Sequence, residues 1–204
     1  MLFDWDGVFN SGEKGAGTTS HFYEADSMGT NLLRFALWKR NQQILPISGV
    51  VSGASSPSAR TFVEREHFHF LATRFKHKSV AIEMICQHFA LDPEAILWVY
   101  DDVLDVSAAR MCGLRIMVSR SASPLFTQYI HKEGLAEYTT AHSGGNFAVR
   151  ELAELLIGLM GDWEEILHHR TTYSSTYQAY LEARQAISPH ALKRLSEGIQ
   201  FMQL

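Results

Sequence analysis

Short runs of apolar residues alternate along this chain with longer segments in which apolar residues recur every three or four positions. Continuous apolar runs are typical of strands buried on both faces of a parallel sheet, and the longer period is typical of helices. We expect strands at 2–5, 43–47, 69–71, 96–100 and 114–118. Helices are expected from near residue 28 and over 58–66, 78–89, 105–111, 123–130 and 149–160. This alternation predicts an α/β fold with a three-layer, doubly wound parallel sheet.

Two segments do not fit the alternation. Residues 9–23 are rich in Gly, Ser and Thr, and we expect a hairpin or flap there (about 9–25), with a mobile loop as the alternative. After a core domain over 1–160, residues 161–204 are expected to form a helical extension: one helix from Trp163 to Leu181, then a second from Ser188-Pro189. The apolar stripes of these helices must be buried, and we favour packing against a neighbouring subunit over packing on the same domain.

Composition restricts the class of partner. The 204 residues carry a formal charge of −4, with 46% hydrophobic and 20% charged residues, which is ordinary for a globular protein and gives no reason to expect nucleic acid or an anionic membrane. Neither a bilayer-spanning apolar run of about 20 residues nor a signal peptide is evident. Cys86 and Cys112 lack metal-ligand spacing, so we expect buried free thiols and a cytoplasmic location.

Candidate chemistry begins at the first predicted strand. Asp4 and Asp6 follow a short apolar run and precede Gly7. Residues two apart on a strand point to the same side, so both carboxylates would converge near its carboxyl end, where open α/β sheets bind ligands. Such close like charges need a cation between them or a retained proton. One carboxylate could then be a metal-bound nucleophile and the other an acid/base; an N-terminal Asx-type turn is the alternative.

Further polar groups fall at the ends of other predicted elements. Ser48-Gly49 follows the run QILPI and could hold a phosphate oxygen through its hydroxyl and N–H groups, although such a dipeptide is usually only a turn. Lys76 and Lys78 stand where a helix begins, a position that disfavours a cation unless an anion is near; solvated lysines are the alternative.

Three carboxylates follow the clearest buried strand, ILWVY. Asp101, Asp102 and Asp105 are hard oxygen ligands of the kind that Mg²⁺ prefers. A helix N-cap would account for one of them but not for all three.

The order of these motifs resembles the haloacid dehalogenase phosphohydrolase superfamily over about residues 2–157. More narrowly, the chain resembles the capless branch that contains 3-deoxy-D-manno-octulosonate 8-phosphate phosphatase. The segments that carry this narrower resemblance are DGVFNSG at 6–12, Asp26-Ser27-Met28-Gly29, ILPISG at 44–49 and GGNFAVRE at 144–151.

The resemblance implies a Mg²⁺-dependent phosphatase that acts on a small phosphorylated sugar or sugar acid and assembles as a homo-oligomer, a tetramer in this branch, with the early hairpin covering a neighbour's site. It implies an aspartyl-phosphate mechanism. The resemblance implies Asp4 as the nucleophile and Asp6 as the general acid/base. The implied phosphate-binding groups are Ser48, Gly49 and Lys78, with Lys76 as a weaker substitute for Lys78. The implied metal ligands are Asp4, Asp6 and Asp101, supported by Asp102 and Asp105.

Departures from the branch pattern leave alternatives open. Val50 and Asn146 stand where arginines are usual, Tyr100 and Ser27 where glycines are usual, so the substrate is not fixed. A catalytically silent protein of the same fold, serving as an assembly or regulatory module, is the second hypothesis. The third hypothesis is a phosphoacceptor receiver domain. In such domains the acidic pair comes first and the phosphorylated aspartate lies mid-chain, whereas here the Asp-x-Asp motif comes first.

Overall fold

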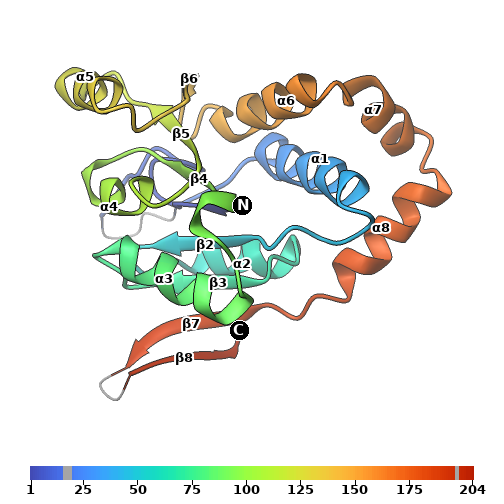
Figure 1. The fold of residues 1–204 in the computed structure, drawn as a ribbon, viewed down its shortest axis with the longest axis horizontal. Helices are drawn as coiled ribbons and strands as arrows, with labels where there is room; N and C mark the ends of the chain where they lie inside the picture. Colours follow the sequence, from blue (N-terminus) through green and yellow to red (C-terminus); the bar gives the residue numbers. More distant parts are fainter. Residues whose placement is uncertain (16–19, 196–197) are drawn as a thin grey trace.

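A mostly parallel sheet forms the centre of the molecule. The computed structural model describes residues 1–15, 20–195 and 198–204. In these residues eight strands lie in the order β6-β5-β4-β1-β2-β3-β7-β8, and β8 alone runs antiparallel to its neighbour (Figure 1). Their bounds are Leu2–Phe3 (β1), Gly49–Ser52 (β2), Phe70–Thr73 (β3), Leu97–Tyr100 (β4), Leu114–Ser119 (β5), Tyr138–Ser143 (β6), His190–Leu195 (β7) and Gly198–Gln203 (β8).

Helices cover both faces of this sheet. The helices are α1 (Glu24–Arg40), α2 (Pro57–Arg65), α3 (Lys78–Phe89), α4 (Val106–Ala109), α5 (Pro124–Lys132), α6 (Ala148–Met160), α7 (Trp163–Thr171) and α8 (Ser175–Gln185), with 3₁₀ turns η1 (Pro93–Ala95) and η2 (Val103–Asp105). Buried side chains of α1, α2, α6, α7 and α8 form one apolar cluster, and those of α3, α4 and α5 form the other. The predicted three-layer α/β fold is therefore confirmed.

The two clusters are joined through strands that contribute to both. Neighbouring residues on a strand point to opposite faces, so Leu2 enters one cluster and Phe3 the other. Val50 and Val51 of β2 divide in the same way. The central strand β4, LWVY, is buried throughout and is a continuous apolar run, as expected for a covered parallel sheet.

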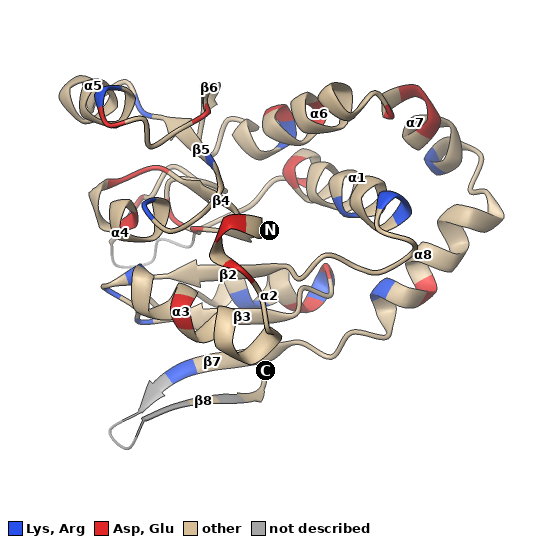
Figure 2. Ribbon diagram, in the orientation of Figure 1, with Lys and Arg blue, Asp and Glu red and all other residues tan. Residues whose placement is uncertain are grey.

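Local chemistry sets the ends of the helices. The α1 helix carries Glu24 and Asp26 in its first turn and Lys39 and Arg40 in its last, matching the helix dipole (Figure 2). At α2 the Ser56 hydroxyl accepts a hydrogen bond from the backbone of the first turn, as a serine N-cap does.

The sheet differs from the prediction at two strands. The expected strand at 43–47 is absent from the described sheet, and β2 begins instead at Gly49. Pro46 offers no N–H for a ladder, whereas Val50 and Val51 are fully buried. Strand β6 was not predicted, since Tyr138-Thr-Thr-Ala-His-Ser has no apolar run; it lies at one end of the sheet (Figure 1).

The C-terminal segment also differs from the prediction. A short break at 172–174 divides the expected single helix into α7 and α8. The prediction of a second helix from Ser188-Pro189 is wrong. Strands β7 and β8 form a hairpin there that extends the sheet beyond β3 (Figure 1). Tyr177 and Tyr180 of α8 are buried against α1 of the same chain, so this helix packs on its own core, the alternative to the favoured packing against a neighbouring subunit.

The predicted flap is partly visible. Among its described residues the loop after β1 makes one isolated bridge, between Asp6 and Asn10, and no strand of a hairpin; residues 16–19 lie outside the described part. Both cysteines are buried free thiols, as expected. No helix in the described residues is long and apolar enough to cross a membrane.

Candidate active site

The candidate site lies where the winding of the sheet changes direction. From β1 the chain proceeds through β2 and β3 on one side and then returns to β4 on the other side of β1. Asp4 directly follows β1, and its N–H donates to the Val99 carbonyl of β4 over 2.8 Å. Asp101 directly follows β4. Ligands of doubly wound sheets bind at this switch point, outside the carboxyl ends of the strands.

Three carboxylates meet there. One ligand oxygen from each of Asp4, Asp101 and Asp105 lies within 4.8 Å of the others, and all three residues are buried. The Oδ1 atom of Asp101 is buried without a hydrogen-bond partner among the described residues. Buried carboxylate oxygens this close together, one of them unsatisfied, suit a hard divalent cation. The residues present therefore fit a magnesium ion.

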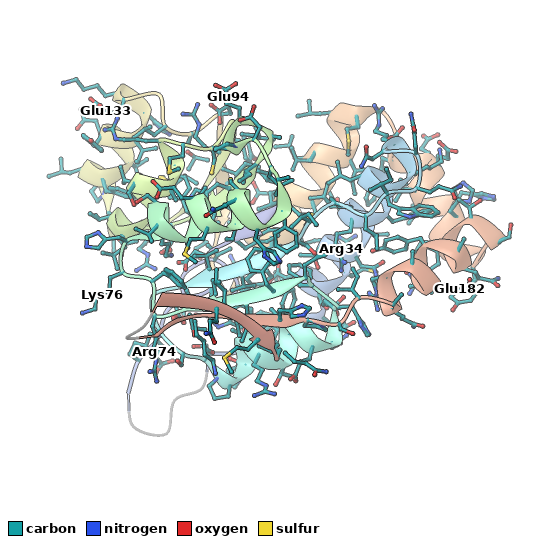
Figure 3. The ribbon with its side chains drawn as sticks, turned by 60° about the horizontal axis from the view of Figure 1, so that its bottom comes forward. Arg34, Arg74, Lys76, Glu94, Glu133 and Glu182 are labelled. Carbon is teal, nitrogen blue, oxygen red and sulfur yellow. The ribbon has the colours of Figure 1, made fainter. Side chains whose placement is uncertain are left out.

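Lys78 lies between two of these carboxylates. Its ammonium is 2.5 Å from the Asp4 carboxylate and also pairs with Asp105, and the Lys78 side chain is only 3% exposed. Lys78 is the first residue of α3, where a cation opposes the helix dipole. The two carboxylates compensate that cost, which explains why a lysine stands at this helix start. Lys76, by contrast, is exposed and projects away from the molecule (Figure 3).

The electrostatics of the site favour binding a cation. Burial raises the pKa of the Asp4 carboxyl well above its usual range; Asp105 and Asp101 raise it further, while Lys78 lowers it. Burial also raises the pKa of Asp101 to about 7, although Arg120 acts in the opposite direction. Burial alone would lower the pKa of Lys78, but Asp4 and Asp105 raise it above its ordinary value. Added positive charge would therefore stabilise the ionised carboxylates.

Asp6 faces the flap. Its carboxylate accepts a hydrogen bond from the Ser20 hydroxyl over 2.9 Å and lies 2.5 Å from the Lys14 ammonium. The Asp6 side chain is 19% exposed, whereas that of Asp4 is 8% exposed. The two carboxylates thus differ: Asp4 is enclosed beside Lys78, and Asp6 is reachable from the flap side.

Asp102 does not join the cluster. Its carboxylate accepts a hydrogen bond from the Val103 N–H over 2.7 Å and caps η2, and the Asp105 carboxylate accepts one from the Asp102 N–H over 3.1 Å. Asp102 is exposed, so its role is to begin the turn that carries Asp105 into the site. The expectation that Asp102 lies beside the metal is therefore corrected, because its carboxylate caps η2 instead.

The structure does not bring Ser48 and Gly49 to the site. Gly49 pairs with Leu2, and its N–H donates to the Met1 carbonyl, so both residues stand at the opposite end of β2 from Asp4. The Ser48 N–H donates to Nδ1 of His69 over 3.1 Å. The prediction that these residues hold phosphate is wrong, because the strand begins where it was expected to end.

A second Ser-Gly pair occupies the predicted position. Ser52 is the last residue of β2 and lies two residues beyond Val50, which pairs with Phe3. Ser52 is buried, and its hydroxyl accepts a hydrogen bond from the Ala54 N–H over 3.2 Å. Ser52-Gly53 therefore stands at the same edge of the sheet as Asp4. The sequence signal that could have identified Ser52-Gly53 is its position directly after the apolar pair Val50-Val51.

One functional candidate escaped the sequence reasoning altogether. Arg120 follows β5, and its guanidinium forms an ion pair with the Asp101 carboxylate, in direct contact with the loop after β1. The departure at Tyr100, by contrast, is structural: the ring is buried, and its hydroxyl donates to the Leu135 carbonyl over 2.9 Å.

Comparison with known proteins finds phosphatases among the proteins that this chain resembles. No protein-family profile matches the chain. A segment of 89 residues is 32% identical to the 3-deoxy-D-manno-octulosonate 8-phosphate phosphatase KdsC of Escherichia coli K12, and the same holds for the Salmonella typhimurium protein. Each match covers 44% of this chain and 44% of the relative, so it spans less than half of the relative's length.

Solved structures extend the likeness of fold. The 3-deoxy-D-manno-octulosonate 8-phosphate phosphatase of Moraxella catarrhalis, solved with magnesium, phosphate and KDO, superimposes with a TM-score of 0.65 at 22% identity, covering 85% of this chain and 91% of that one. The cobalt-bound phosphatase YrbI of Haemophilus influenzae gives 0.64 at 20% identity, covering 88% and 94%. The chain thus has the fold of these phosphatases and of a putative HAD-superfamily hydrolase from Legionella pneumophila. Over the matched segment its sequence resembles that of the KdsC phosphatases.

Proposed function

We propose that this protein is a Mg²⁺-dependent phosphatase that hydrolyses a small phosphorylated sugar or sugar acid, such as 3-deoxy-D-manno-octulosonate 8-phosphate. The observation that carries the proposal is the buried cluster at the switch point, in which Lys78 pairs with Asp4 and Asp105 and one oxygen of Asp101 remains unsatisfied. Such a cluster would supply the nucleophile, the cation and the metal ligands that phosphoryl transfer requires. The choice of substrate is supported by the sequence likeness to KdsC.

In this proposal Asp4 is the nucleophile. A carboxylate oxygen of Asp4 attacks phosphorus, the bond from phosphorus to the sugar oxygen breaks, and an aspartyl-phosphate forms. Asp6, which faces the flap, gives its proton to the leaving sugar oxygen. Asp6 then removes a proton from the water that attacks phosphorus, which frees Asp4 and releases inorganic phosphate.

Three cationic or donor groups would hold the phosphoryl oxygens. Lys78 is fixed 2.5 Å from the Asp4 carboxylate, so its charge is already positioned where negative charge develops. Ser52 and the Gly53 N–H, at the end of β2, would bind phosphate in place of Ser48 and Gly49. Mg²⁺ held by Asp4, the Asp6 carbonyl and Asp101 would supply further positive charge, with Asp105 supporting the site through Lys78.

A silent protein of the same fold is the second candidate. It is favoured by the ion pair between Arg120 and Asp101, which engages a proposed metal ligand with a cation of the chain itself. The two candidates differ in one observable, turnover in the presence of Mg²⁺.

Phosphate release from a panel of phosphorylated sugars and sugar acids tests the proposal. We expect release that requires Mg²⁺, stops when the metal is chelated and is fastest with an eight-carbon sugar acid phosphate. The isosteric Asp4→Asn variant should fold and be inactive. Release that continues under chelation would contradict the metal assignment, and no release from any compound by the folded protein would favour the silent alternative.

A further inference from the structure

Arg120 connects two loops at the carboxyl end of the sheet. It follows β5, and its guanidinium crosses the end of β4 to pair with the Oδ2 atom of Asp101. The Asp101 side chain is 1% exposed, while that of Arg120 is 35% exposed. A mobile surface arginine would gain little from such a contact. Here one partner is buried, so the pair contributes more than an exposed one.

The surrounding backbone leaves room for this guanidinium. Gly7 has φ +88°, and a Cβ there would lie 2.0 Å from Oδ2 of Asp101 and 2.4 Å from Nη2 of Arg120. A Cβ at Gly12 would lie 3.4 Å from the same Nη2 atom. The loop after β1 and the start of the flap therefore form two sides of the space that the guanidinium fills.

The same carboxylate belongs to the set that fits a divalent cation. Asp4, Asp101 and Asp105 each bring one oxygen within 4.8 Å of the others. Arg120 pairs with Oδ2 of Asp101, while Oδ1 has no hydrogen-bond partner among the described residues. A guanidinium and a divalent ion bound to the two oxygens of one carboxylate would repel each other, and the repulsion would be little screened beside a buried carboxylate. Arg120 and a metal ion would thus compete for Asp101.

Building on the proposed metal site, we propose that Arg120 is the counter-ion of Asp101 before metal binds, that Mg²⁺ displaces it, and that the released guanidinium then binds an anionic oxygen of the substrate. Arg120 is a positioning and binding residue in this scheme. It couples the two ligands, because the anion has a strong binding group only after the metal has taken Asp101.

The charges of the site support this order of events. Without metal, four carboxylates face three cations among the residues that the structure describes. The carboxylates are Asp4, Asp6, Asp101 and Asp105, and the cations are Lys14, Lys78 and Arg120. A divalent ion reverses the excess to positive, which suits a phosphoryl dianion. Lys78 is locked between two carboxylates, whereas Arg120 is partly exposed and can offer its planar fork to phosphate or carboxylate oxygens.

Calorimetric titration of the chelator-treated protein with Mg²⁺ tests the competition. Arg120→Ala should bind Mg²⁺ at least about tenfold more tightly than the parent, since its Asp101 is free; tenfold corresponds to about 1.4 kcal/mol. Arg120→Gln, which keeps a hydrogen-bond donor without charge, should behave similarly. Arg110→Ala is the matched control, because Arg110 is an exposed arginine that pairs with Glu133 away from the site, and its affinity should equal that of the parent.

Titration with inorganic phosphate at saturating Mg²⁺ tests the second half. Here Arg120→Ala should bind phosphate about tenfold more weakly than the parent, so that the two affinities change in opposite directions. A purely structural role would not produce this reversal. Unchanged or weaker Mg²⁺ affinity in Arg120→Ala, or unchanged phosphate affinity, would overturn the inference and leave the proposed function standing. If neither the parent nor any variant binds Mg²⁺, both the inference and the proposed magnesium site fail.

Discussion

Individual buried charges decide the chemistry of this protein. Lys78 and Asp4 are each nearly inaccessible, and a charge in such a place is tolerated only with a partner at hydrogen-bonding distance. In the proposed reaction, this pairing would fix the ammonium beside the carboxylate before substrate binds, so little reorganisation would remain for the chemical step. Exposed Lys76, two residues away, has no such constraint.

Ser52 and Ser48 provide a matched pair of substitutions. If Ser52 holds a phosphoryl oxygen, Ser52→Ala should lower kcat/KM by about 10²-fold, the cost of losing one donor to a developing negative charge. Ser48→Ala should leave kcat/KM unchanged, because Ser48 lies beside His69 at the other end of the strand. Equal effects of the two substitutions on kcat/KM would show that β2 does not present Ser52 to the substrate.

His69 predicts a pH dependence of stability. Burial first, and then nearby positive charge, lowers the pKa of His69 from 6.5 to about 4, and its Nδ1 must stay unprotonated to accept the Ser48 N–H. A folded pKa below the unfolded one adds stability that is complete above pH 6.5 and is lost as pH falls toward 4. The loss is at most about 1.4 kcal/mol per pH unit.

Urea unfolding across this pH range measures the effect. His69→Asn keeps an acceptor for the Ser48 N–H but does not titrate, so its free energy of unfolding should fall less than that of the parent between pH 6.5 and 4. Parallel curves for the two proteins would contradict the assignment.

At the scale of elements, α8 joins the C-terminal segment to the core. The Tyr177 hydroxyl donates to Oδ1 of Asn31 over 2.9 Å, and the Tyr180 hydroxyl donates to the Asn31 carbonyl over 3.1 Å. Both rings pack on Phe35, with centroid distances of 5.2 Å. Helix α8 is thus held by α1, and the β7–β8 hairpin that follows completes the sheet beyond β3.

Two tyrosines of this region test how much the attachment contributes. Tyr180→Ala removes a fully buried aromatic ring and should lower the free energy of unfolding by about 3–5 kcal/mol. Tyr173→Ala is the control, since that ring is 53% exposed, and its effect should stay within about 0.5 kcal/mol. Denaturant unfolding of both variants gives the comparison; a Tyr180→Ala protein as stable as the control would show that α8 is dispensable.

The elements also show where sequence reasoning succeeds and fails. Helix α3 is predictable from its helical period and strand β4 from its continuous apolar run, and their boundaries at Lys78 and Tyr100 are clear. The hairpin was not, because Leu192, Leu195, Ile199 and Met202 happen to recur at helical spacing. The free edge of β3 decided the outcome: the His190 N–H donates to the His69 carbonyl, and β7 continues the ladder.

At the scale of the whole molecule, the topology determined how much of the site could be foreseen. Asp4, Lys78, Asp101 and Asp105 follow strands or begin a helix, and a parallel sheet brings such positions together. Arg120 could not be foreseen, since its contact with Asp101 depends on the path of a long side chain across a neighbouring strand. Ser48 was chosen wrongly because the short strand β2 lies between two Ser-Gly pairs.

Assembly remains a prediction at this scale. We expect a homo-oligomer, a tetramer as in the branch that the sequence resembles, with the segment around 9–25 at the interface. The site has no separate cap domain in the described residues, so a neighbouring subunit would be needed to cover it. Light scattering at micromolar concentration should give the mass of a tetramer; a monomer would contradict the prediction.

The most direct test of the central claim is to look for phosphate on Asp4. A single turnover with the best substrate and Mg²⁺, quenched in acid, should leave a phosphoryl group on the N-terminal peptide that contains Asp4, stable in acid and lost in base as an acyl phosphate is. The Asp4→Asn protein should show none. Turnover that proceeds at the parent's rate in Asp4→Asn, or a phosphoryl group found on another residue, would contradict the account.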